Sequence, residues 1–314
     1  MNESHPWWLE EVPRFLDDTL AHINQANRRT DAVDRCEDLC KALNKTWNTH
    51  FAYRRRRGEL TDKEASGDSS DTQAFDQLFL SGLDDALAEI LCRCDSVANL
   101  AAFTPQVMNH DILNRRGYDP SEIGDPLRKE ASEAHRQLLN AFRRYHEGRM
   151  DRESRESLLK KLRQLIYVVR CNIAHSEKTP RGPDLGKSER DRGVCEVVSA
   201  VIMDLFERLF ERPSRRLAAY GTLRPGEPNH SIVADLDGEW TVGAVRGEVG
   251  MNGGFPVLRW TTSGPEIEVM VLTSDDLPDH YPRLDRFEGS SYERVWVPVM
   301  CGSSVIVANI YQGI

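Results

Sequence analysis

The sequence predicts an α+β protein of two domains, an all-α helical bundle at 1–213 and a small mixed β-barrel at 216–314. Its 314 residues exceed the usual size of one domain. The first 212 residues carry apolar side chains at steps of three and four with few Gly or Pro, the pattern of helices. After Arg216 come short β-rich runs broken by Gly and Pro. The boundary is therefore expected near 213–216.

The helix over 194–210 has the clearest apolar stripe, and Pro213 lies where it should end. Similar stripes predict helices over 8–23, 33–47 and 75–90, and two further helices fit at 126–146 and 151–174. Polar segments at 61–71 and 114–125 separate them. In the C-terminal part the predicted strands contain the runs LAAYGTL, VGAVRGEVG, EIEVMVLT, RVWVPVM and VIVANIYQ.

Composition places the chain among folded, soluble proteins. It is 39% hydrophobic and 29% charged, and no stretch reaches the roughly 20 apolar residues that span a bilayer. The N-terminus lacks the pattern of a signal peptide, and seven cysteines lie mostly within apolar helical stripes. We therefore expect a cytoplasmic protein with reduced thiols, no membrane partner and no bound metal.

The charge of −9 is unevenly divided along the chain. Residues 216–314 hold 7 Lys/Arg and 13 Asp/Glu, which leaves 34 and 37 for residues 1–215. An acidic chain argues against broad nonspecific binding to nucleic acid, although the Arg-rich N-terminal part leaves room for a local basic groove. The run of four arginines at 54–57 is either such an RNA contact or a solvated helix end.

Three motifs in the C-terminal part point to one kind of site. YGTLRPG at 220–226 follows a predicted strand and carries Gly and Pro where a tight loop would expose successive backbone amides. VRGEV follows at 245–249 and LDRFEGSSYERVWVPV at 284–299. In this order and spacing the three resemble γ-glutamylcyclotransferase-like proteins, including the γ-glutamylamine cyclotransferases, over nearly all of 217–314.

This resemblance implies a cyclisation in which the α-amine of a γ-glutamyl group attacks its own γ-carbonyl and releases 5-oxoproline, without a cofactor. It assigns the catalytic base to Glu288, since an ammonium group must lose a proton to become a nucleophile. The substrate α-carboxylate would be held by Tyr220, Gly221, Thr222 and Leu223.

Each of these assignments has a structural alternative. YGTLRPG also fits an ordinary strand followed by a Pro-Gly turn, and Glu288 fits a solvated turn residue before Gly289. Tyr292 is expected either to line the substrate pocket or to belong to the core, as a Tyr that opens a strand often does. Asp285 is expected to cap a helix or a turn.

A second motif, RCNIAH at 170–175, closes one predicted helix and precedes the last. In this context it resembles the HEPN family of helical domains, many of which are metal-independent ribonucleases with an Arg followed after four to six residues by His. The resemblance implies a homodimer in which Arg170 stabilises phosphate charge, His175 transfers a proton and Asn172 binds substrate. Cys171 departs from the polar residue that often follows the Arg, and His175 could instead cap a helix end.

Together the motifs favour a cyclotransferase-like domain, which processes or binds a γ-glutamyl compound, fused to a HEPN-like RNA-cleaving domain. A toxin or defence role follows only by family analogy. Two alternatives stay open. The C-terminal domain is a noncatalytic ligand-binding regulator of a HEPN-type ribonuclease, or the helices are a dimerisation scaffold for a metabolic cyclotransferase.

Overall fold

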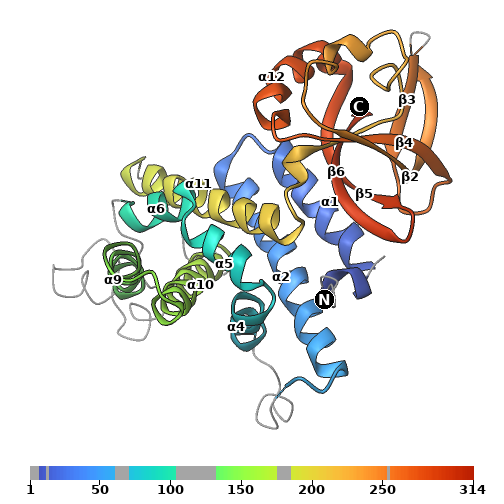
Figure 1. Ribbon diagram of the computed structural model, residues 1–314. Coiled ribbons are helices and arrows are strands. Elements are labelled where there is room, and N and C mark those ends of the chain that lie inside the picture. Colours follow the sequence, from blue (N-terminus) through green and yellow to red (C-terminus); the bar gives the residue numbers. More distant parts are fainter. Residues whose placement is uncertain (1–6, 12–13, 61–70, 104–131, 175–184, 253–254) are drawn as a thin grey trace. The chain divides into compact units, whose positions relative to one another are not determined.

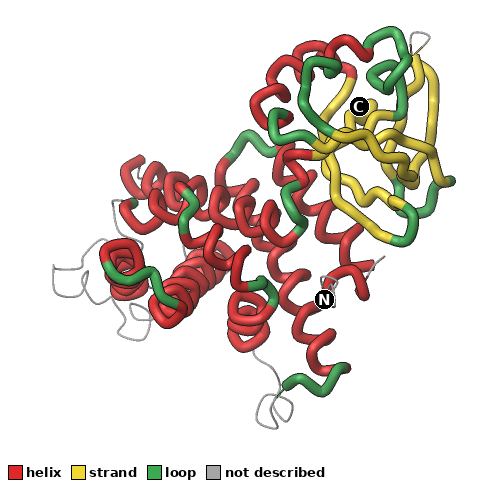
Figure 2. Tube along the Cα trace, in the orientation of Figure 1, coloured by secondary structure: helices red, strands yellow, loops and turns green. Residues whose placement is uncertain are grey.

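The computed structural model describes residues 7–11, 14–60, 71–103, 132–174, 185–252 and 255–314 (Figure 1). The chain forms two compact units, one of Gln25–Arg208 and one of Met1–Asn24 with Leu209–Ile314. Helices fill the described part of the first unit, and the strands lie in the second (Figure 2). No helix in the described residues is long and apolar enough to cross a membrane. The domain boundary expected near 213–216 stays a prediction.

The helical unit confirms the helical prediction for the N-terminal region. Its helices are α2 (Ala32–Arg56), α4 (Asp71–Ser81), α5 (Asp85–Cys92), α6 (Asp95–Ala102), α9 (Glu133–Glu147), α10 (Arg152–Ala174) and α11 (Leu185–Leu209). The helix predicted over 75–90 is divided into α4 and α5, because the Asp84 side chain accepts from the backbone N–H of Leu87 at 2.7 Å and starts a new helix. Helix α6 was not predicted.

Apolar side chains on facing helices form the core of this unit. The rings of Trp47 on α2 and Phe75 on α4 lie 4.3 Å apart, and Phe79 packs edge-on against Phe75 at 5.0 Å. Leu162 and Leu165 of α10 are fully buried. The periodic stripes read from the sequence are therefore the buried faces of these helices.

The N-terminal segment belongs to the second unit. A 3-10 helix, η1 (Trp7–Glu11), and helix α1 (Arg14–Arg28) replace the single helix predicted over 8–23. The indole N–H of Trp8 donates to the Leu209 carbonyl at 3.0 Å. The amide of Asn24 exchanges two 2.8 Å hydrogen bonds with the backbone N–H and carbonyl of Trp296 on β5. These buried polar contacts attach the segment to the C-terminal chain.

The C-terminal chain folds into the predicted small mixed β-barrel. Its strands are β1 (Arg216–Ala219), β2 (Glu239–Asn252), β3 (Phe255–Trp260), β4 (Glu266–Thr273), β5 (Tyr292–Cys301) and β6 (Ser304–Gly313), in the order β3-β2-β4-β1-β6-β5. A further pairing of Ala244 on β2 with Met300 on β5 closes a ring of five strands, with β3 paired to β2 beside it. The β1–β6 pair is parallel and the others are antiparallel.

Two apolar clusters stabilise this unit. The barrel interior holds the buried, alternating residues of its strands, among them Val245, Val269 and Val297. The second cluster lies between the outside of the barrel and the last helix, α12 (Leu277–Glu288), and includes Leu217, Leu272, Leu277, Tyr281 and Leu284. It fixes α12 against the end of β1, which positions the site described next.

Candidate active site

Helix α12 carries Glu288 at its last position. Tyr281, Leu284 and Glu288 lie three or four residues apart, so they share one face of the helix. The first two are buried in the cluster beneath α12, and Glu288 follows them at the edge of that cluster. Gly289 ends the helix with a φ of 65°, a conformation that strongly favours glycine. The Glu-Gly pair therefore ends a helix and is not a solvated turn.

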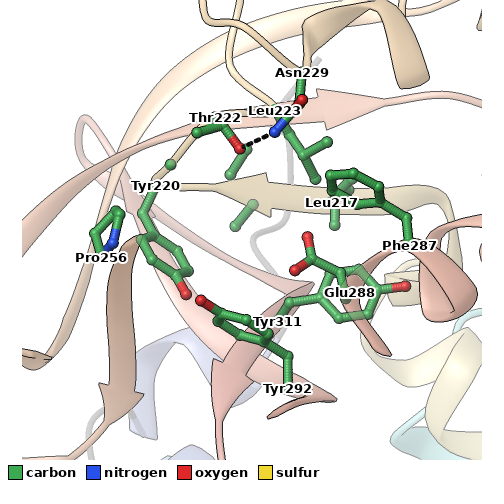
Figure 3. A pocket seen from close by; sticks show the side chains of 13 residues that line it. Leu217, Tyr220, Thr222, Leu223, Asn229, Pro256, Phe287, Glu288, Tyr292 and Tyr311 are labelled. Carbon is green, nitrogen blue, oxygen red and sulfur yellow. Dashed lines mark hydrogen bonds between the residues drawn. The ribbon is translucent and has the colours of Figure 1, made fainter. Parts of the chain in front are cut away.

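A cavity of about 300 Å³ brings the predicted C-terminal residues together (Figure 3). It is lined by Leu217, Ala218, Ala219, Tyr220, Gly221, Thr222, Leu223, Asn229, Pro256, Phe287, Glu288, Tyr292 and Tyr311. The four residues of the predicted loop and Glu288 therefore face the same space. Tyr292 opens β5 and lines the cavity, but it also packs against the apolar cluster beneath α12. Tyr292 therefore borders both the cavity and the core, the two positions expected for it as alternatives.

The loop at 220–223 leaves β1 and is held by the residues that follow it. Asn229 donates from its side chain to the Thr222 hydroxyl at 2.9 Å and from its backbone to the Thr222 carbonyl at 3.0 Å. Among the described residues, none accepts a hydrogen bond from the backbone N–H of Gly221, Thr222 or Leu223. Three successive donors in a loop beside a cavity form an arrangement suited to an anion.

The cavity is apolar around a single charged side chain. Its described lining contains no Lys or Arg, and Glu288 is its one titratable carboxylate. Burial raises the pKa of Glu288 to about 7, and no cation among the residues that the structure describes opposes this effect. Burial likewise raises the pKa of Tyr220 to about 12. Near neutral pH the cavity therefore offers a carboxylate that can take or return a proton.

Asp285 does not cap a helix or a turn, contrary to the expectation from the sequence. It lies in the last turn of α12, where it accepts hydrogen bonds from Arg294 and from the Tyr311 hydroxyl. Tyr311, Phe287, Pro256 and Asn229 also line the cavity without having been predicted. Phe287 could have been found from the sequence, because it lies next to Glu288 in the motif at 284–299. Tyr311 carries no such signal, because only the closed barrel places this residue of β6 at the cavity.

The N-terminal motif is described only in part. Asn172, on the last turn of α10, is buried, and Arg170 is half-buried. A second cavity, of about 230 Å³, is lined by Glu37, Cys40, Lys41, Asn44, Arg170 and Ile173. His175 lies outside the described residues. The predicted pairing of Arg170 with His175 is therefore neither supported nor contradicted.

Comparison with known proteins agrees with the C-terminal motifs. Residues 217–313 match the family described as gamma-glutamyl cyclotransferase, AIG2-like. This AIG2-like region contains every residue that lines the cavity of Glu288. The matched residues lie outside the helical unit, so the HEPN-like identity stays a prediction. No curated protein matches the chain.

Three solved structures illustrate the likeness. An AIG2-like protein from Mus musculus is 21% identical, with 31% of this chain and 76% of that chain covered and a TM-score of 0.28. An uncharacterized protein from Pyrococcus horikoshii is 22% identical over the same shares, with a TM-score of 0.25. YkqA from Bacillus subtilis is 26% identical, with 32% and 35% covered and a TM-score of 0.28.

Proposed function

We propose that the AIG2-like region releases 5-oxoproline from a γ-glutamyl amide by intramolecular cyclisation. The observation that carries this proposal is Glu288, a half-buried carboxylate with a pKa of about 7 that lines the same cavity as the loop with three unoccupied backbone N–H groups. The N–H groups bind the substrate α-carboxylate, and Glu288 takes a proton from the α-amine. A loop of successive amides suits the first task, and a base poised near neutral pH suits the second.

The reaction balances with these groups alone. The lone pair of the deprotonated α-amine forms a bond to the γ-carbonyl carbon, and the bond from that carbon to the former amide nitrogen breaks. Glu288 gives the proton that it took from the α-ammonium group to the departing amine. The attacking nitrogen then loses its second proton to the freed Glu288 carboxylate, which passes it to solvent, and so becomes the lactam N–H of 5-oxoproline. Binding both ends of the glutamyl group in one small cavity brings the amine and carbonyl into near-attack geometry, which supplies much of the rate enhancement.

The test is turnover of γ-L-glutamyl-p-nitroanilide, followed by the release of p-nitroaniline and of 5-oxoproline. Glu288→Gln keeps the shape of the side chain but removes the base, so we expect turnover to fall by about 10²- to 10⁴-fold. Glu266→Gln is the matched control, because Glu266 is an exposed glutamate on β4 of the same unit. Equal turnover by the parent chain and Glu288→Gln would overturn the proposal.

A noncatalytic, ligand-binding role for the same cavity gives a different result. In that case the parent chain binds 5-oxoproline or a γ-glutamyl amide in calorimetry but releases no product. Glu288→Gln then changes affinity and leaves the absence of turnover unaltered.

We further propose that the helical unit is a HEPN-type ribonuclease that acts as a homodimer. The observation that favours it is the cavity in which Arg170 lies with Asn44 and with Lys41, which pairs there with Glu37 at 3.3 Å. Cationic and amide side chains bind phosphate oxygens. The expected result is cleavage of tRNA or total RNA in the presence of EDTA, lost in both Arg170→Ala and His175→Ala. Arg143→Ala, an exposed arginine of α9, is the control. Equal cleavage by all variants would contradict the proposal.

A further inference from the structure

The last turn of α12 is attached to two strands of the barrel through Asp285. Its carboxylate accepts from Nε and Nη2 of Arg294 on β5, at 2.9 and 3.2 Å, and from the hydroxyl of Tyr311 on β6 at 2.5 Å. Two parallel N–H donors from one guanidinium fix the orientation of a carboxylate as well as its position. Asp285 is thus held from two directions.

Arg294 is itself held on its other sides. Its Nη1 donates to the side-chain oxygen of Asn309 on β6 at 3.3 Å, and its guanidinium lies 4.1 Å from the ring centroid of Tyr281. The Tyr281 hydroxyl donates to the Arg216 carbonyl of β1 at 3.0 Å. The network therefore joins two turns of α12 to β1, β5 and β6.

This network lies directly behind the candidate active site. Asp285 and Glu288 are three residues apart on α12 and so occupy one side of the helix on consecutive turns. Tyr311, whose hydroxyl is engaged by Asp285, lines the cavity that contains Glu288. A movement of Asp285 would shift both Glu288 and the aromatic wall of the cavity.

The charges in the network are matched. Burial alone would raise the pKa of Asp285, but the hydrogen bonds from Arg294 and Tyr311 outweigh it and hold the pKa below its usual value. Asp285 is consequently ionised at neutral pH and neutralises Arg294. Glu288 instead has Tyr220 and Tyr292 as its titratable neighbours. Two carboxylates one turn apart are thereby kept in different environments.

We propose that Asp285 is a positioning residue for the cyclisation, which holds Glu288 and Tyr311 in their reactive arrangement through its contacts with Arg294 and Tyr311. The proposal rests on the proposed cyclotransferase function. Asp285 does not touch the substrate; it acts through its neighbours. Its removal is therefore expected to lower kcat more than it raises KM.

The experiment measures kcat and KM for γ-L-glutamyl-p-nitroanilide in the full chain carrying Asp285→Ala, Asp285→Asn or Tyr311→Phe. Misplacing a catalytic group by about 1 Å costs on the order of 10²-fold in rate, which is the expected fall in kcat for Asp285→Ala. Asp285→Asn keeps an acceptor for Tyr311 and should recover part of the loss. Tyr311→Phe removes a single hydroxyl, so it stays informative if Asp285→Ala does not fold.

Asp235→Asn is the matched control, because Asp235 also pairs with an arginine of α12, Arg283 at 3.3 Å, but on the exposed surface. Its kcat should equal that of the parent. The pH profile separates positioning from mere support. In Asp285→Asn a displaced Glu288 is less buried, so its pKa falls toward that of an ordinary glutamate and the acid limb of kcat moves to lower pH.

The two proposals fail in different ways. Absence of turnover by the parent chain would overturn the cyclotransferase function. Turnover by the parent together with an unchanged kcat in folded Asp285→Ala and Tyr311→Phe would overturn only the role of Asp285. A reduced yield of folded protein with normal kcat and an unmoved pH profile would also contradict it, since that is the signature of structural support.

Discussion

The barrel unit and the helical unit differ in how their sequence motifs map onto a site. In the barrel unit, motifs at 220–226 and 284–299 come together in one cavity, where the loop and Glu288 face each other. In the helical unit, Arg170 and Asn172 end a helix, and the cavity beside Arg170 is completed by residues of α2 that no motif singled out. Two distant motifs that converge on one cavity support a function more strongly than a single short window does.

The largest expected effect compares the cores of the two units. Leu284 of α12 and Leu165 of α10 are both fully buried, and truncation of such a leucine costs about 2–5 kcal/mol. Leu284→Ala should destabilise the barrel unit and lower cyclotransferase turnover, because the same helix carries Glu288. Leu165→Ala should destabilise the helical unit and leave turnover unchanged. Thermal unfolding and turnover of the two variants are the measurements.

The opposite pattern would break the comparison. If Leu165→Ala abolished turnover in folded protein, the barrel unit would not contain a self-sufficient site, and the cavity of Glu288 would have to be interpreted together with the helices.

A smaller effect is expected on the pH dependence of stability. The pKa of Glu288 is about 7 in the folded chain, against 4.5 for an ordinary glutamate. The folded state therefore holds this proton more tightly than the unfolded state does. The contribution of protonated Glu288 to the free energy of unfolding is fully present below pH about 4.5 and is lost as the pH rises through about 7. One pKa unit corresponds to about 1.4 kcal/mol, and partial exposure of the side chain reduces the full value to about 1–2 kcal/mol.

Glu288→Gln removes this loss. Denaturant unfolding should therefore find the variant more stable than the parent at pH 8, relative to their difference at pH 4. If the stability of the two proteins depended on pH in the same way, the Glu288 carboxylate would be well solvated. Its pKa would then not be raised, and it would not be a base suited to proton transfer near neutral pH.

Much of the fold could be predicted because the spacing of apolar residues along the sequence follows the period of a helix or a strand. The stripes over 33–47, 151–174 and 194–210 are buried faces of α2, α10 and α11, and the five β-rich runs fall on β1, β2, β4, β5 and β6. The points at which one helix ends and the next begins were harder to predict. Asp84 divides one apolar stripe into two helices through a single capping hydrogen bond, a local contact that leaves the apolar period unchanged.

The candidate site was predictable where chemistry and motif coincide, as at Glu288 and the loop 220–223. Tyr311 and Asp285 were missed as partners, because their contact depends on how β6 closes the barrel beside α12. Local pattern does not report which residues distant in sequence share a hydrogen bond. The hydrogen bond between Tyr311 and Asp285 is therefore known only from the folded structure.

The central claim, that Glu288 is the base of a cyclisation, is tested most directly by the pH dependence of kcat/KM for 5-oxoproline release. The α-amine of the substrate stays largely an ammonium group below pH about 7.5, so an acid limb below that pH reports the base on the protein. We predict that kcat/KM falls tenfold per pH unit below about 7, with the limb absent from any residual activity of Glu288→Gln. A rate independent of pH between about 5 and 7, or the same limb in Glu288→Gln, would contradict the claim.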